Sequence, residues 1–133
     1  MKALKARITR GLPTGSEVET CDNSGAKVIR IFTVMGLKTV KSRRSAAGVG
    51  DLVMASVKRG RPDMRKQVVL AVIVRQKKEY RRPEGMRIKF EDNSAVVVKD
   101  DKGNPKGTIF KGPIAKEACD RWPGIAKIAR IIV

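Results

Sequence analysis

The sequence predicts a mainly β protein whose strands form a closed or nearly closed barrel, followed by one or two short C-terminal helices. Short apolar segments alternate with turn residues through most of the chain. The longest apolar run, residues 68–74 (VVLAVIV), is too short for a typical helix and suits a central strand buried on both faces. Near the C-terminus the pattern changes to spaced apolar and basic residues, and Pro123 is placed to open a helix.

The other strands follow from the same reasoning. Residues 18–21 form a short strand, and the Asx and Gly residues at 22–25 (DNSG) form a tight turn in which Gly25 takes a positive φ. Further strands are expected at residues 27–35, 51–58 and 95–99. Residues 100–105 (DDKGNP) form a turn, and Asp22 and Asp92 are interpreted as turn caps.

Residues 75–90 predict a hairpin that extends beyond the barrel. Residues 82–85 (RPEG) favour a type I turn. On the outgoing arm, Gln76, Lys78, Tyr80 and Arg82 alternate with Arg75, Lys77, Glu79 and Arg81. Because both sets are charged or polar, we expect neither face to bury against protein, and we expect a polyanion beside this ribbon. Tyr80 either stacks on a base or packs across the ribbon.

Composition points to a nucleic-acid partner. The 133 residues fit one domain and carry 30 Lys and Arg against 13 Asp and Glu, a net charge of +17 that bound anions must offset. No apolar run approaches the ~20 residues of a spanning helix, and no signal peptide is recognisable, so we expect a cytoplasmic protein. Aromatic residues make up only 4% of the chain, which favours recognition of backbone and shape over base stacking.

The sequence offers little for catalysis or for a cofactor. Histidine is absent, and Cys21 and Cys119 belong to no metal-binding pair, so both are expected to be free thiols. No glycine pattern matches a phosphate-binding loop, and no pair of carboxylates suggests acid–base chemistry. We therefore expect no catalytic, cofactor or metal site, and Trp122 is interpreted as a packing anchor.

Four basic segments are the candidate contacts to nucleic acid. Residues 1–16 form an arm that is either a disordered tail or orders on nucleic acid. Residues 36–50 contain Lys, Arg and small residues, a composition that fits phosphate contact better than a solvated loop. With the connection after the third strand and the ribbon, the predicted RNA-binding residues are Lys38, Lys41, Arg43, Arg44, Arg59, Arg61, Arg65, Lys66, Arg75, Lys77, Lys78, Tyr80, Arg81, Arg82 and Lys89.

One long stretch, AVIVRQKKEYRRPEGMRIKFEDNSAVVVKDD, resembles the central signature of the large-ribosomal-subunit protein L-fourteen family. CDNSGAK, SRRSAAGVGDLVMASVKRG and KGTIFKGPIAKEACDRWPGIAKIA resemble the matching stretches of that family. The arm and AAGVGDLVMASVKRGRP are closest to its archaeal and eukaryotic branch. Glu84 departs from the usual Asp of the turn but keeps the charge.

The resemblance implies a five-stranded β barrel with a protruding basic ribbon, residues 1–16 being an arm and 17–133 a single domain with its C-terminal helices. It implies a structural constituent of the large ribosomal subunit, bound to large-subunit rRNA near the subunit interface, without catalysis. It also implies contacts with neighbouring large-subunit proteins and small-subunit rRNA, and docking of an anti-association factor near the C-terminal region. A free-standing RNA-binding translation factor with a barrel fold is the alternative, and an enzyme acting on RNA ranks last.

Overall fold

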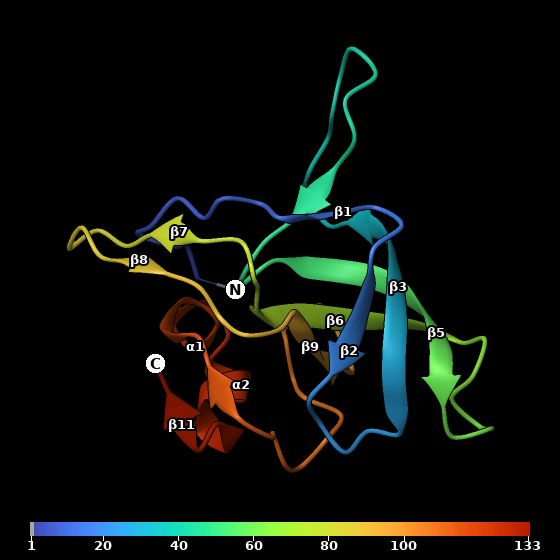
Figure 1. Ribbon diagram of the computed structural model, residues 1–133. Helices are drawn as coiled ribbons and strands as arrows, with labels where there is room; N and C mark the ends of the chain where they lie inside the picture. The colour runs from blue at the N-terminus through green and yellow to red at the C-terminus, as the bar shows by residue number, and fades with distance from the viewer. Residues whose placement is uncertain (1) are drawn as a thin grey trace.

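A computed structural model describes residues 2–133, and five of its strands close into a barrel (Figure 1). The strands are β2 (Glu17–Thr20), β3 (Ala26–Val34), β5 (Leu52–Gly60), β6 (Val68–Arg75) and β9 (Ser94–Val98). They are hydrogen-bonded in that order, and β2 pairs in parallel with β9 to close the barrel, whereas the other four pairings are antiparallel. The predicted five-stranded barrel is confirmed.

Shorter elements surround the barrel. Strand β1 (Leu12–Pro13) pairs with β4 (Ala46–Ala47), and β7 (Tyr80–Arg81) pairs with β8 (Arg87–Ile88) in the predicted ribbon. The C-terminal region holds α1 (Lys116–Arg121), α2 (Pro123–Ile128), and the parallel strands β10 (Pro113–Ile114) and β11 (Ile131–Ile132). As predicted, Pro123 begins a helix, where its missing N–H costs no hydrogen bond.

From Ala71 to Val74, strand β6 is buried on both faces, as its uninterrupted apolar sequence predicts, whereas Val68 at its start is exposed. Ala71 and Ile73 point into the barrel and join the core formed by residues from all five strands. Val72 and Val74 point outward into a second core that includes residues of α1 and α2. The two helices therefore cover one outer face of the barrel, which allows the apolar segment of β6 to occupy the middle of the fold.

Trp122 anchors the second core, in agreement with its prediction as a packing residue. Its side chain is fully buried, and its indole Nε1 donates a hydrogen bond to the backbone oxygen of Gly50 at 2.8 Å. Cys21 and Cys119 lie in the same core and are free. Burial raises the pKa of each thiol to about 11, so both are protonated near neutral pH.

The turns have the predicted chemistry. Gly25 takes a φ of +103° between β2 and β3. The buried carboxylate of Asp22 accepts hydrogen bonds from the Ser24 hydroxyl and from the backbone N–H of Val97, both at 2.9 Å. Asp22 thus caps its own turn and ties it to β9.

The N-terminal arm lies against the domain over residues 2–16 (Figure 1). Leu12 is buried in the barrel core, and the backbone oxygen of Thr9 accepts a hydrogen bond from the side chain of Gln76 at 2.8 Å. Near the start of the arm, the backbone N–H of Lys2 donates to the backbone oxygen of Arg121 at 3.0 Å. The boundary at Ser16 between an arm and a domain stays a prediction.

Over residues 2–133, neither helix combines the length and the apolar character that crossing a membrane requires.

Replacing Gly25 by Val should lower the free energy of unfolding by about 1–3 kcal/mol, because a β-branched residue is strained at this positive φ. An added Cβ would also displace the guanidinium of Arg61, which donates a hydrogen bond to the backbone oxygen of Ser24 at 3.1 Å, so loss of this contact adds to the backbone strain. Urea denaturation of the isolated protein measures the effect. Gly25→Asn, which tolerates positive φ better, should cost less. Equal stability of wild type and Gly25→Val would contradict this account.

Candidate RNA-binding surface

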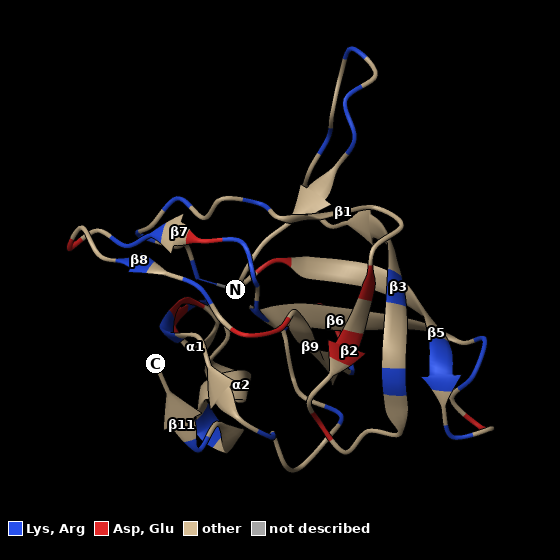
Figure 2. Ribbon diagram, viewed as in Figure 1, with Lys and Arg blue, Asp and Glu red and all other residues tan. Residues whose placement is uncertain are grey.

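Three basic elements extend from the barrel in different directions (Figure 2). They are the loop between β3 and β4, the connection between β5 and β6, and the ribbon with its flanking residues. Twelve of the fifteen predicted RNA-binding residues are exposed on them, namely Lys38, Lys41, Arg43, Arg44, Arg59, Arg61, Arg65, Lys66, Lys77, Lys78, Arg81 and Lys89. They form three separate groups around the barrel.

The loop between β3 and β4 projects furthest from the barrel (Figure 1). Its base is held by the β1–β4 pair and by a hydrogen bond from Arg44 Nε to Thr14 Oγ1 at 3.3 Å. Lys41 and Ser42 have φ values of 57° and 58°, so the chain reverses at the tip through two residues in the left-handed region. The geometry holds Lys38, Lys41 and Arg43 away from the body of the protein.

The connection between β5 and β6 gathers more basic residues than the sequence indicated. Arg59 and Arg65 line a hollow of about 470 Å³ together with Lys27 and Lys58. Arg61 lines a neighbouring hollow of about 540 Å³ to which Lys111 also contributes. Lys27 and Lys58 lie beside this connection because Ala26 of β3 pairs with Gly60 of β5 in an irregular register, which strand alternation alone does not predict. Lys111 comes from a loop distant in the sequence, and no pattern near it predicts that it lies beside Arg61.

Three predicted RNA-binding residues are instead buried, so the prediction that neither face of the ribbon contacts protein is wrong. Arg75 is 7% exposed and donates five hydrogen bonds. Its acceptors are the carboxylate of Asp92, the hydroxyl of Ser94 and the backbone oxygens of Lys111 and Pro113, at 2.8–3.2 Å. All five guanidinium N–H groups therefore have partners inside the protein.

Tyr80 and Arg82 are buried against Glu117 of α1. The hydroxyl of Tyr80 donates to Glu117 Oε2 at 2.8 Å, and Arg82 Nε donates to Oε1 at 2.7 Å. Arg82 also donates to the backbone oxygen of Val133 at 2.6 Å. Burial raises the pKa of Tyr80, and the neighbouring carboxylate of Glu117 raises it further. For Arg82, burial alone would lower the pKa, but the hydrogen bond and the charge of Glu117 outweigh burial and raise it. Tyr80 packs rather than presenting its ring to a base.

Gln76 completes this buried layer. Its Oε1 accepts from the backbone N–H of Val49 at 2.9 Å, and its Nε2 donates to the backbone oxygens of Thr9 and Lys78, each at 2.8 Å. One fully buried amide thus joins the N-terminal arm, the loop before β5 and the ribbon. Gln76, Tyr80 and Arg82 are buried together as the predicted alternation suggests, but Lys78 of the same predicted face is exposed and Arg75 of the opposite face is buried, so the alternation is only partly correct.

The ribbon itself is shorter than expected. Strand β6 ends at Arg75, and only Tyr80 and Arg81 pair with β8. The turn at residues 82–85 forms with a hydrogen bond from the backbone N–H of Gly85 to the oxygen of Arg82 at 2.9 Å. Lys77, Lys78 and Arg81 therefore stand on the exposed side of a ribbon whose other side is fixed to the domain.

The surface has the features for binding a polyanion. Among residues 2–133, no group of three or more His, Cys, Asp or Glu is placed to hold a metal ion. The exposed Lys and Arg side chains offer point charges and forked N–H donors that match phosphate oxygens. Fold and surface together define the class of small, basic β-barrel proteins that present cations on extended loops.

Comparisons with known proteins identify the family. Residues 11–133 match the family described as "Ribosomal protein L14p/L23e". The chain is 56% identical over 133 residues to the "Large ribosomal subunit protein uL14" of Nanoarchaeum equitans (strain Kin4-M), covering 100% of both chains. It is 50% identical over 132 residues to the protein of the same name from Methanococcus vannielii, covering 99% of each. The chain belongs to the ribosomal protein L14p/L23e family.

The neighbouring residues Arg81 and Arg82 should respond differently to replacement by Ala. Arg82→Ala should cost about 3–5 kcal/mol of unfolding free energy, because it leaves the buried carboxylate of Glu117 without its cation. Arg81→Ala is an exposed change at the preceding residue and should stay within about 0.5 kcal/mol of wild type. Urea denaturation of both variants measures the difference. Similar stabilities would show that the Arg82–Glu117 pair does not hold the ribbon.

Proposed function

We propose that the protein is a structural constituent of the large ribosomal subunit that binds large-subunit rRNA and performs no catalysis. Its membership of the ribosomal protein L14p/L23e family, with relatives matched from end to end, is the observation that carries the proposal. The net charge of +17 supports it, because a folded protein of this size needs a polyanion to offset such an excess.

The geometry suits contact with the RNA backbone at several separated places. The closed barrel has no free edge strand of its own and fixes where each basic element leaves it. Buried Arg75 and Arg82 hold the two ends of the ribbon's outgoing segment, so Lys77, Lys78 and Arg81 are presented from a fixed base. Each exposed cation that meets a phosphate releases counterions and adds to affinity.

The partners follow from the same proposal. They are large-subunit rRNA and neighbouring large-subunit proteins, which places the chain on the ribosome in the cytoplasm. Contact with small-subunit rRNA and docking of an anti-association factor near the C-terminal region are finer parts of the proposal and rest on the family resemblance. The exposed apolar side chains of Ile131, Ile132 and Val133 are consistent with a protein partner there.

A free-standing translation factor with a barrel fold is the competing function, and sedimentation separates the two. Cells producing a tagged copy of the protein are lysed, and their ribosomal subunits are run on sucrose gradients in high salt. A structural constituent should stay in the large-subunit peak in amounts comparable to the subunit. Release of the tagged protein to the top of the gradient would support a factor and reject the proposal.

Replacing Lys77 and Arg81 together by Ala should weaken binding to deproteinised large-subunit rRNA. If each contacts a phosphate, the slope of log affinity against log salt should fall in magnitude by about 2. Stability should hardly change, because both side chains are exposed. Lys127→Ala/Arg130→Ala removes the same charge from the C-terminal region and should change the slope less. Equal changes in both double variants would show a general charge effect in place of ribbon contact.

A further inference from the structure

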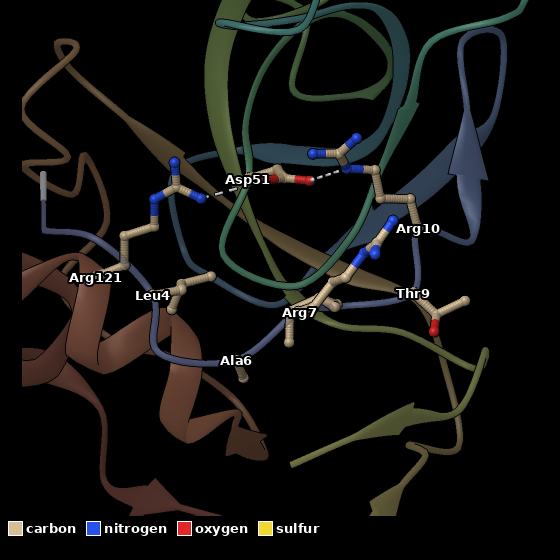
Figure 3. A pocket seen from close by; sticks show the side chains of 8 residues that line it. Leu4, Ala6, Arg7, Thr9, Arg10, Asp51 and Arg121 are labelled. Carbon is tan, nitrogen blue, oxygen red and sulfur yellow. Dashed lines mark hydrogen bonds and ion pairs between the residues drawn. The ribbon is translucent and has the colours of Figure 1, made fainter. Parts of the chain in front are cut away.

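A pocket of about 750 Å³ lies between the N-terminal arm and the barrel, and three arginines line it. Arg7 and Arg10 come from the arm, and Arg121 comes from the end of α1. The carboxylate of Asp51 lies between Arg10 and Arg121 (Figure 3). One carboxylate faces three guanidinium groups, which leaves two positive charges unbalanced within the pocket.

The contacts of Asp51 are weaker than those of the structural ion pairs elsewhere in the protein. Its Oδ1 lies 3.3 Å from Arg121 Nη1, and its Oδ2 lies 3.9 Å from Arg10 Nε. The shortest contacts of the buried pairs Arg82–Glu117 and Arg75–Asp92 are 2.7 and 2.9 Å. Strong guanidinium–carboxylate pairs have the shorter distances and use two parallel hydrogen bonds. The pocket arginines are therefore not saturated by Asp51.

Free donors remain on each of these arginines. Arg7 is exposed and has no ion-pair partner among residues 2–133, and the side chain of Arg10 is 50% exposed. Arg121 Nε is buried without a hydrogen-bond partner within the part of the chain that the structure describes. That atom is shielded from the pocket, so Arg121 can meet a ligand only through its Nη groups, on a side chain that is 22% exposed and whose Nη1 contacts Asp51 at 3.3 Å.

The pocket is fixed in shape before any ligand arrives. At one end of the arm, Lys2 N–H donates to the backbone oxygen of Arg121, and at the other, Gln76 holds the backbone oxygen of Thr9. Gly48 permits the close approach of the arm, since a Cβ there would lie 3.0 Å from Ile8 Cγ2. A preorganised site loses less entropy on binding.

We infer that this pocket binds a phosphate of the RNA backbone through Arg7, Arg10 and Arg121, whose charge the single carboxylate of Asp51 offsets only in part. The inference rests on the proposed function and adds a fourth contact region, formed by the arm and α1 together. Arginine forks match the oxygens of a phosphate, and the two unbalanced charges match an anionic backbone. The arm thus lines part of the proposed phosphate-binding pocket and also contributes positive charge to it.

The first experiment uses inorganic phosphate as the probe and the ¹⁵N-labelled full chain. Titration at constant ionic strength should give saturable NMR shifts of the arm amides and of the arginine Nε–Hε signals. Arg7→Gln/Arg10→Gln should abolish them, whereas Lys2→Gln/Lys5→Gln removes the same charge from the same arm and should retain them. Retention of the shifts in the arginine variant would overturn the inference. Equal shifts with acetate would assign the site to carboxylates and overturn it too.

The variant Asp51→Asn distinguishes a phosphate-binding site from a set of contacts that only hold the N-terminal arm against the domain. In the wild type, Asp51 Oδ2 accepts a hydrogen bond from the backbone N–H of Gly48 at 2.8 Å. The Asn side chain can still accept this hydrogen bond, but it carries no negative charge. If the pocket binds phosphate, removing a nearby negative charge should tighten phosphate binding by about threefold. If the arginines serve only to fasten the arm to Asp51, the variant should loosen the arm and weaken binding. Weaker or unchanged binding would overturn the inference.

The same variants are then tested with deproteinised large-subunit rRNA over a range of KCl concentrations. Arg7→Gln/Arg10→Gln removes the contact to one phosphate and should lower the salt slope in magnitude by about 1, and Lys2→Gln/Lys5→Gln should lower it less. Equal slopes for the two variants would overturn the pocket as an RNA contact while leaving the proposed function intact. Failure of the wild-type protein to bind rRNA would reject the proposed function, and the phosphate titration would still test the pocket.

Discussion

The two-sided burial of β6 is the constraint on which the rest of the structure depends. Ala71 and Ile73 need the barrel to close around them, whereas Val72 and Val74 need a cover on the outside. That cover is provided by α1, α2 and Trp122, which lie about fifty residues further along the chain. At ~25 cal/mol per Å² of apolar surface removed from water, leaving either face exposed would cost several kcal/mol. The barrel and the C-terminal helices therefore share one cluster of buried side chains.

Two buried arginines, one at the end of β6 and one at the ribbon turn, hold the segment that carries the surface cations. Arg75 is held by Asp92, Ser94 and two backbone oxygens, and Arg82 is held by Glu117 and the C-terminal residue. Replacing such pairs by apolar residues is often neutral for stability, so their value lies in the unique geometry that they specify. Here that geometry fixes a ribbon whose exposed side carries Lys77, Lys78 and Arg81.

The lowered pKa of Asp92 shows how this support depends on pH. Burial alone would raise that pKa, but hydrogen bonds from Arg75 and Ser94 outweigh it and lower it. A carboxyl group whose pKa is lower in the folded state stabilises the fold above its unfolded pKa. That stabilisation is lost as the pH falls through the pKa of Asp92 in the folded state. The Arg75–Asp92 contact at the base of the ribbon is therefore fully formed at neutral pH and weakens in acid.

The charge excess explains why so many basic side chains stand on extensions and so few on the barrel wall. Self-repulsion among thirty cations is smaller when they are spread over separate loops in salt solution, where charges further apart than about 8–10 Å are largely screened. The loop between β3 and β4, the connection between β5 and β6, and the ribbon leave the barrel in different directions (Figure 2). This arrangement also reaches several segments of a folded RNA.

The sequence by itself determined the local features of this protein. Pattern was enough to predict the strand β6, the turn at Gly25 and the helix start at Pro123, because each is a property of a short segment.

Only the tertiary structure decided which cations remain available to a ligand. Arg75, Tyr80 and Arg82 look like their exposed neighbours in sequence, and Arg7, Arg10 and Arg121 have no common motif. Their roles depend on Asp92, Glu117 and Asp51, which packing brings to them from 17 to 70 residues away. Periodicity and composition report how a segment folds locally, whereas the partner of a charge is set by long-range packing that neither records.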